Sequence, residues 1–167
     1  KGSGFSAQFN LTGEGGRITY KEPIPVRGGE RVTLSAAVQQ GASDSGKAGG
    51  GVFLYFLDAN GEPIPDSVVR GNMVTDGSGG AWHLSTLSAL APPNAAYMKI
   101  GGVAYRTTGN DPLWMDDFRW SFSVPNGDFI DGDTGWSVKE DGWRIVPNGP
   151  PNPDFSGLDS FTFRAND

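Results

Sequence analysis

Residues 30–38, ERVTLSAAV, alternate between two kinds of side chain from Arg31 onward. One set is Val32, Leu34, Ala36 and Val38, and the other is Arg31, Thr33, Ser35 and Ala37. A period of two is the pattern of a β-strand that buries one face, because successive side chains of a strand point to opposite sides. The segment therefore predicts a strand with its even-numbered residues in a core, and the rest of the chain has to supply partner strands.

Three further segments predict strands. Residues 51–58, GVFLYFLD, are apolar on both faces, which indicates a central strand, and Asn60-Gly61 after them is a strong tight-turn signal. Residues 95–107, AAYMKIGGVAYRT, predict a strand with a bulge or bend at Gly101-Gly102. Residues 113–122, LWMDDFRWSF, predict the next strand.

Helical signals are nearly absent. Residues 84–90, LSTLSAL, have apolar spacing that would suit a short helix, but Pro92-Pro93 follows almost at once and stops one. The chain has 167 residues with 26 Gly and 12 Pro, and five Trp, ten Phe and four Tyr supply buriable surface that disordered chains lack. We therefore expect an all-β fold, a two-sheet antiparallel β-sandwich, with many short strands and tight turns.

Composition also excludes some functions. The net charge is −6 and no run of Lys and Arg is present, so nucleic acid is not an expected partner. No apolar run approaches the ~18 residues that a membrane helix needs, so we expect no membrane insertion. The chain has no Cys and no initiator Met, so we expect no disulfide and a piece of a longer polypeptide.

The character of the chain changes after Ser123. Residues 126–136, NGDFIDGDTGW, and 147–157, PNGPPNPDFSG, are dense in turn residues, and Val124-Pro125 marks a candidate boundary. Residues 1–9, KGSGFSAQF, and 139–147, KEDGWRIVP, share a Lys followed by Gly and an aromatic residue. This echo favours an internal repeat.

The order of these segments resembles the jelly-roll carbohydrate-binding modules appended to xylanases and cellulases, in the groups numbered four, nine and twenty-two. The resemblance runs through PVRGGERVTLSAAV, FLYFLDANGEPI, AWHLSTLSALAPPNAAYMKI and LWMDDFRWSF, and the typical opening element of such modules is similar to NGDFIDGDTGW. Here that element follows the closing strand. The resemblance therefore implies that residues 1–124 are a module lacking its opening strand. Residues 125–167 would be the start of a second, incomplete copy or a C-terminal extension packing on the first.

The expected core of this sandwich takes its residues from the predicted strands. They are Val32, Leu34, Val38, Phe56, Trp82, Met98, Ile100, Phe118 and Trp120. Buried aromatic residues are also expected in the C-terminal segment, at Phe129, Trp136, Trp143, Phe161 and Phe163.

Asp116 and Asp117 are adjacent carboxylates inside the apolar run WMDDFRW. Neighbours on a strand point to opposite faces, so the pair cannot flank one glycosidic bond. His83 has no partner nucleophile, and no Gly-x-Ser-x-Gly motif is present, so we expect no enzyme. The resemblance implies a structural Ca²⁺ ligand at Asp116, although Ile130 stands where the modules carry a Glu ligand. The alternative, a solvated or capped acid at a strand end, stays open.

Aromatic rings whose strand parity is opposite to the core are the candidates for stacking on sugars, with cationic side chains nearby to reach hydroxyl groups. The predicted glycan-binding residues are Tyr55, Tyr97, Lys99, Tyr105, Arg106 and Trp114.

We therefore expect a non-catalytic glycan-binding module of a larger extracellular or virion protein, which binds a polysaccharide or cell-surface glycan beside neighbouring domains of the same polypeptide. The alternative is a structural or assembly module of a phage tail fibre or baseplate protein. Such a module would bind no ligand and would form homo-oligomers.

Overall fold

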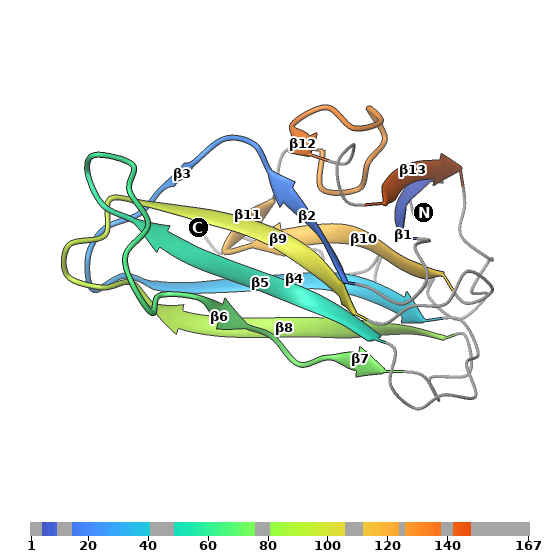
Figure 1. Ribbon diagram of the computed structural model, residues 1–167, viewed down its shortest axis with the longest axis horizontal. Coiled ribbons are helices and arrows are strands. Elements are labelled where there is room, and N and C mark those ends of the chain that lie inside the picture. The colour runs from blue at the N-terminus through green and yellow to red at the C-terminus, as the bar shows by residue number, and fades with distance from the viewer. Residues whose placement is uncertain are drawn as a thin grey trace, which may run out of the picture.

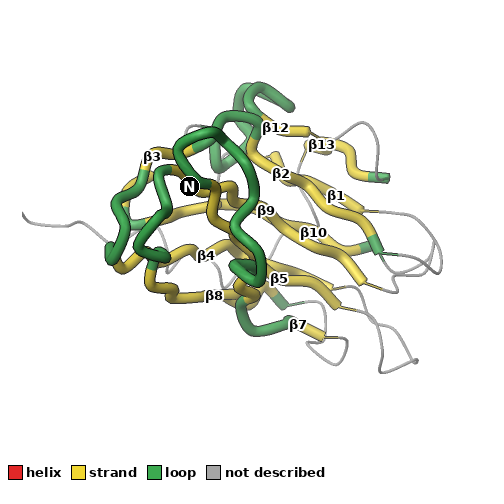
Figure 2. The backbone as a smooth tube through the Cα atoms, turned by 60° about the vertical axis from the view of Figure 1, so that its left-hand side comes forward, coloured by secondary structure: helices red, strands yellow, loops and turns green. Residues whose placement is uncertain are grey.

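The computed structural model describes residues 5–9, 15–40, 49–75, 81–105, 112–123, 126–137 and 142–147. These residues form strands and loops without a helix (Figure 2). None of the described residues belongs to a helix long and apolar enough to cross a membrane. The strands lie in two layers that face each other across a single core (Figure 1). The predicted all-β sandwich of jelly-roll type is confirmed.

The first sheet has the strand order β13-β1-β10-β4-β8, with β11 paired to β10. Its strands are β1 (Phe5–Phe9), β4 (Arg31–Gln40), β8 (Trp82–Leu90), β10 (Leu113–Trp120), β11 (Phe122–Ser123) and β13 (Trp143–Pro147). Every pairing between them is antiparallel.

The second sheet has the strand order β12-β2-β9-β5-β6, with β3 paired to β9 and β7 paired to β5. Its strands are β2 (Gly16–Tyr20), β3 (Ile24–Pro25), β5 (Gly49–Leu57), β6 (Val69–Arg70), β7 (Val74–Thr75), β9 (Tyr97–Tyr105) and β12 (Trp136–Ser137). These pairings are also antiparallel.

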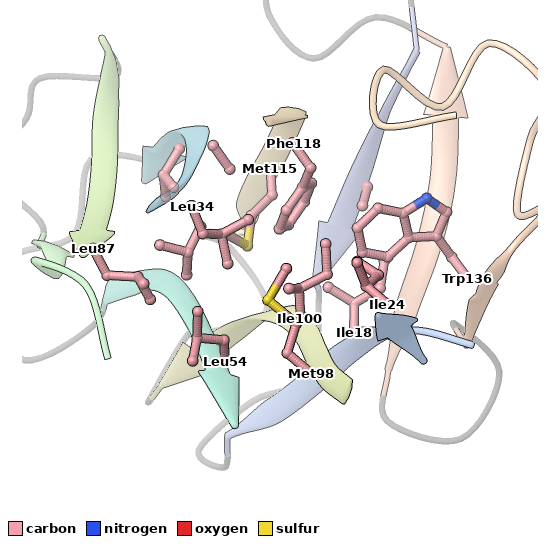
Figure 3. Packing of buried hydrophobic residues seen from close by; sticks show 14 of the residues in the cluster. Ile18, Ile24, Leu34, Leu54, Leu87, Met98, Ile100, Met115, Phe118 and Trp136 are labelled. Atoms are coloured by element: carbon pink, nitrogen blue, oxygen red, sulfur yellow. The ribbon is translucent and has the colours of Figure 1, made fainter. Parts of the chain in front are cut away.

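Alternation along β4 decides which face of the first sheet is buried. The even-numbered residues from Val32 to Val38 all belong to the core, while Arg31 and Thr33 are exposed, as the sequence predicts. Leu34, Leu87 and Phe118 from this sheet face Leu54, Met98 and Ile100 from the other (Figure 3). The core is therefore an interdigitated layer between two pleated faces.

Most of the predicted core is confirmed, with two exceptions among the tryptophans. Val32, Leu34, Val38, Phe56, Met98, Ile100 and Phe118 are all buried in the cluster. Trp120 is only partly buried but packs against it. Trp82 is not part of it, so its assignment to the core is wrong.

Gly101 and Gly102 do not form the predicted bulge. The β5–β9 ladder runs without a register shift from Gly49↔Tyr105 to Leu57↔Tyr97. A Cβ at Gly102 would instead collide with the sulfur of Met115, which reaches across from β10. The glycine therefore serves the close approach of the two sheets.

An irregularity lies in β10 between Asp116 and Arg119, where the register against β4 shifts. Asp117 has a φ of 52°, in the left-handed region that a bulge often uses. Because of this shift, Asp116 pairs with Ala37 whereas Trp120 pairs with the core residue Leu34. Strict alternation would give Asp116 the inward parity of Phe118 and Trp120, and the bulge turns it to the outer side.

The segment after residue 125 contributes to both sheets. β12 pairs with β2 and β13 pairs with β1. Phe129, Trp136 and Trp143 are each at most 4% exposed, and Trp136 lies beside Ile18 and Ile24 (Figure 3). Phe161 and Phe163 fall outside the described residues. The division of the chain at residue 124, with a second copy or an extension beyond it, stays a prediction.

The loop between β11 and β12 is organised by Asn126. Its amide nitrogen donates to the carbonyls of Gly132 and Thr134, at 3.0 and 2.9 Å, and its amide oxygen accepts from the Asp131 N–H at 2.9 Å. Phe129 in this loop has a φ of 56°, which is costly for a bulky residue. The three hydrogen bonds fix the loop in the conformation that drives this ring into the core.

Candidate functional site

The outer face of the first sheet carries two tryptophans on strands that flank β4. In β8 the buried residues are Ser85, Leu87 and Ala89, so Trp82 has the outward parity. In β10 Leu113 and Met115 enter the core, so Trp114 also faces outward. Both indoles are partly exposed.

Strand register places these two indoles on either side of one residue. Gln39 of β4 pairs with Trp82 of β8 and with Trp114 of β10. Adjacent strands lie ~4.8 Å apart, so the two indoles start from backbones ~10 Å apart. The row continues through Gln8 of β1, which pairs with Trp114, to Arg144 of β13, which pairs with Gln8.

The row of Arg144, Gln8, Trp114, Gln39 and Trp82 crosses five strands, or ~19 Å. We call it the tryptophan row. Gln8 is 8% exposed and Gln39 is 2% exposed, although both lie on the outer face. The larger side chains of Trp82, Trp114 and Arg144 lie beside these two glutamines and cover them. The row therefore presents two broad rings and one arginine to solvent over a polar floor.

The neighbouring row on the same face also has a buried residue on β4 and an exposed large residue on β8. Asp116 pairs with Ala37 of β4, which in turn pairs with Leu84 of β8. Ala37 is buried outside the core cluster, whereas Leu84 is 47% exposed. Apolar surface therefore continues beside Trp82 along β8.

Three of the predicted glycan-binding residues lie together on the other outer face. Tyr55 and Lys99 are cross-strand partners in β5 and β9, and Tyr97 pairs with Leu57 in the same ladder. The structure therefore brings Tyr55, Tyr97 and Lys99 together, on the second sheet. Trp114 lies on the first sheet, on the opposite side of the molecule.

The side chains of the second outer face are largely engaged with one another. The ring of Tyr55 stacks on Phe53 with centroids 6.5 Å apart, and the guanidinium of Arg17 lies 5.6 Å from the Phe53 centroid. Phe53 is only 4% exposed beneath them. The ammonium of Lys99 donates to the carbonyls of Tyr20 and Lys21. Burial lowers the pKa of Lys99, against an opposing effect of Glu22.

The two remaining predicted sugar contacts are less informative. Tyr105 ends β9 and is 48% exposed, at the far end of the second sheet from Tyr97. Arg106 lies outside the described residues. The sugar-binding role of all six residues stays a prediction.

Asp116, the predicted calcium ligand, is partly buried beside the bulge. Its carboxylate oxygen accepts a hydrogen bond from the Asp117 N–H at 2.7 Å. Burial raises the pKa of Asp116 to about 8, and the charges of Asp117 and Asp128 act in the same direction. Asp117 itself pairs with Arg119, with Oδ1 and Nε 2.8 Å apart. No group of three or more His, Cys, Asp or Glu side chains among the described residues could hold a metal ion. The Ca²⁺ assignment stays a prediction.

Sequence reasoning missed four members of the tryptophan row: Trp82, Gln39, Gln8 and Arg144. Leu84 and Leu90 share the parity of Trp82, so hydrophobicity alone does not reveal that this face of the strand is the outer one. The buried Ser85 belongs to the inner face, because its hydroxyl serves the backbone: it accepts from Val52 N–H and donates to the Asn72 carbonyl. Gln8 and Arg144 belong to the row only because β1 pairs with β10 and β13, which are far from it in the sequence.

No protein-family model matches the chain, and no curated protein matches it. Among solved structures, the unliganded carbohydrate-binding module of PbXyn10C aligns with a TM-score of 0.52 at 13% identity, over 88% of this chain and 90% of that one. A family 16 carbohydrate-binding module aligns at 0.46 and 14% identity over 69% of this chain and 74% of that one.

The enzymatically active domain of tailspike protein 4 from bacteriophage CBA120 aligns at a TM-score of 0.48 and 13% identity. That match covers 71% of this chain and 15% of the tailspike chain. In its fold, the chain resembles a jelly-roll carbohydrate-binding module.

Proposed function

We propose that this chain is a non-catalytic glycan-binding module of a larger extracellular protein, and that sugar rings stack on Trp82 and Trp114. The observation that carries the proposal is the position of these two indoles, which flank Gln39 on one outward sheet face. Pyranose rings present flat C–H faces, and partly exposed indoles on a pleated sheet offer flat partners for them. The resemblance in fold to a carbohydrate-binding module supports the same class of function.

The shape of the face favours an extended chain over a compact ligand. The tryptophan row runs perpendicular to the strands for ~19 Å, which is longer than one sugar unit. We infer that a polysaccharide lies along the row, with one unit on each indole. Because a face of this kind encloses little of its ligand, we expect modest affinity, about micromolar to millimolar.

The acids on this face favour binding over hydrolysis. Asp117 is held by Arg119, and the raised pKa of Asp116 keeps that carboxyl protonated near neutral pH. A glycosidase needs two carboxyl groups that face each other across the sugar. The adjacent pair at the bulge does not have that arrangement, because Asp116 and Asp117 are consecutive residues with the first bonded to the backbone of the second.

The test is titration calorimetry against a panel of polysaccharides, with one variant on each outer face. Trp82→Ala and Trp114→Ala should each weaken binding by about fivefold, since a stacked ring contributes on the order of 1 kcal/mol. Tyr55→Ala is the matched control, because it also removes an outward aromatic ring but from the second sheet.

The opposite pattern would place the site elsewhere. Binding that survives both tryptophan variants and is lost in Tyr55→Ala would move the site to the second sheet, where Tyr55, Tyr97 and Lys99 lie. Complete absence of binding to any glycan would favour the structural or assembly module of a phage fibre instead.

A further inference from the structure

Arg144 ends the tryptophan row on β13, the edge strand beside β1 (Figure 1). Its side chain is exposed, but its Nε donates to the amide oxygen of Gln8 at 2.7 Å. Gln8 is itself 8% exposed, so the acceptor is held within the sheet surface. This contact fixes the guanidinium on the outer face and leaves the two terminal nitrogens for another partner.

Three other arginines of the two outer faces have partners of their own. Arg119 pairs with Asp117, Arg17 lies over the ring of Phe53, and Arg31 donates to the hydroxyl of Ser88 at 3.4 Å. No carboxylate of the described residues forms an ion pair with Arg144. The chain carries 19 acidic and 13 basic residues, so acids are more numerous than bases. Arg144 nevertheless lies on the surface without an acidic partner among the described residues.

A guanidinium with two free terminal nitrogens matches a carboxylate, because its parallel N–H groups meet both oxygens at once. An anionic ligand would otherwise be repelled by a protein of net charge −6. A fixed cation at one end of a stacking surface would overcome this repulsion locally. Asp116, an acid of the neighbouring row, lies on β10, two strands away from β13.

We propose that Arg144 is a carboxylate subsite, and that the preferred ligand is an acidic polysaccharide such as one containing uronic acid units. This inference rests on the proposed function, because it assigns the substrate class of the same face. β13 is two strands from β10, or ~10 Å, so the carboxylate belongs to a unit beyond the one stacked on Trp114. The two oxygens of a uronate match the two terminal N–H groups of this fork.

The test uses polygalacturonate and alginate, each beside its carboxyl-reduced form, in which the acid is replaced by a primary alcohol. The wild-type chain should bind at least one carboxylated form about ten- to a hundredfold more tightly than its reduced counterpart, the range for charge-assisted hydrogen bonds. Arg144→Gln should abolish this preference, so that the carboxylated and the reduced forms bind the variant about equally. Arg144→Lys should retain part of it.

Arg31→Gln is the matched control, because it removes a positive charge from the same face at the distant end of β4. It should keep the preference, and thermal unfolding should show that all variants are folded. A preference that persists in Arg144→Gln, or tighter binding of a sulfated glycan than of a carboxylated one, would overturn the subsite. If Trp82→Ala and Trp114→Ala still weaken binding in that case, the proposed function stands without it. Failure to bind either form of any glycan would overturn both.

Discussion

At the scale of single residues, the bulge at Asp117 determines the environment of its neighbour. The register shift puts Asp116 beside Trp114 on the outer side of the sheet and opposite Ala37, not in the core. Burial there, together with the charges of Asp117 and Asp128, raises the pKa of Asp116 to about 8, from an ordinary value of 3.8. Near neutral pH, Asp116 therefore keeps a proton in the folded state that it loses in the unfolded chain.

Asp116 should therefore make stability fall as pH rises. Between pH ~4 and ~8 the folded state keeps the proton and the unfolded state has lost it, so the unfolded state binds fewer protons and the free energy of unfolding decreases with pH. The contribution is complete below pH ~4 and lost above pH ~8. Urea unfolding in the presence of a chelator at pH 5.5 and pH 8 should show the decrease in the wild type and a much smaller one in Asp116→Asn.

Asp117→Asn is the control, because it removes the ion pair with Arg119 and should leave most of the slope in place, since burial is the largest cause of the raised pKa of Asp116. Equal slopes in the wild type and Asp116→Asn would contradict the assignment.

Added Ca²⁺ tests the metal prediction separately. If Asp116 is a ligand, Ca²⁺ should raise the unfolding midpoint of the wild type but not that of Asp116→Asn. An unchanged midpoint in the wild type would show that Asp116 is not a Ca²⁺ ligand.

At the scale of elements, the exposed edge of β8 is covered by one side chain. Asn72, between β6 and β7, donates through its amide to the Leu84 carbonyl at 3.0 Å and accepts from the Thr86 N–H at 2.7 Å. Its backbone N–H also donates to the Thr86 carbonyl at 3.2 Å. Asn72, in the connection between two strands of the second sheet, thus satisfies edge groups of β8 that a further strand would otherwise pair with. This blocks pairing of β8 with another chain.

Asn72→Ala should lower the free energy of unfolding by about 1–3 kcal/mol, because it leaves two backbone groups of β8 without this partner. It should also increase self-association. Denaturant unfolding and analytical ultracentrifugation measure the two effects. Asn94→Ala, in an exposed turn, is the comparison and should change neither. An Asn72→Ala protein as stable as Asn94→Ala would show that water replaces the amide without loss.

The segment from Asn126 to Trp136 is a second element with a measurable role. Trp136 is fully buried, contacts Phe118 with ring centroids 4.6 Å apart, and donates its indole N–H to the Asn126 carbonyl at 2.9 Å. Trp136→Ala should therefore destabilise the protein by about 3–5 kcal/mol. Ile130→Ala, in the same loop but 57% exposed, should change stability by less than ~0.5 kcal/mol. Similar losses in both variants would mean that the loop, and not the buried ring, stabilises the sandwich.

Elements could be predicted where local pattern and tertiary environment agree. β4 shows its alternation openly, and β5 is apolar on both faces because each of its faces is covered. β8 was ambiguous, since its inward positions are small or polar: Ser85 supports backbone hydrogen bonds and Ala89 fills little volume. Its large residues Leu84 and Leu90 are exposed, so hydrophobicity alone suggests the wrong buried face for this strand.

At the scale of the whole molecule, the two outer faces differ in what they leave available. The second sheet covers Phe53 with Arg17 and Tyr55, whereas the first presents two indoles and Arg144 in one row. Composition and turn signals sufficed to predict a sandwich. They could not predict the row, because it joins β13, β1, β10, β4 and β8, whose order in the sheet differs from their order in the chain.

A single face of this kind should bind weakly, and strong attachment to a polymer should require several copies. Two indoles at about 1 kcal/mol each, with one charge-assisted contact of about 1.5–3 kcal/mol, correspond to a monovalent affinity near the millimolar range. Two copies joined by a flexible Gly/Ser linker should therefore bind a long polysaccharide about 10²–10⁴-fold more tightly than one copy, provided that the linker lets both reach the same polymer. A short oligosaccharide that spans one ~19 Å row should bind both proteins with the same affinity per site, since it cannot bridge two faces. Calorimetry with the short ligand and a polysaccharide pull-down with the long one separate these effects, and a tandem protein with Trp114→Ala in one copy should return to single-copy binding. Equal retention of the single and tandem proteins on the polymer would mean that the row, by itself, already binds more tightly than stacking on a flat sheet can explain.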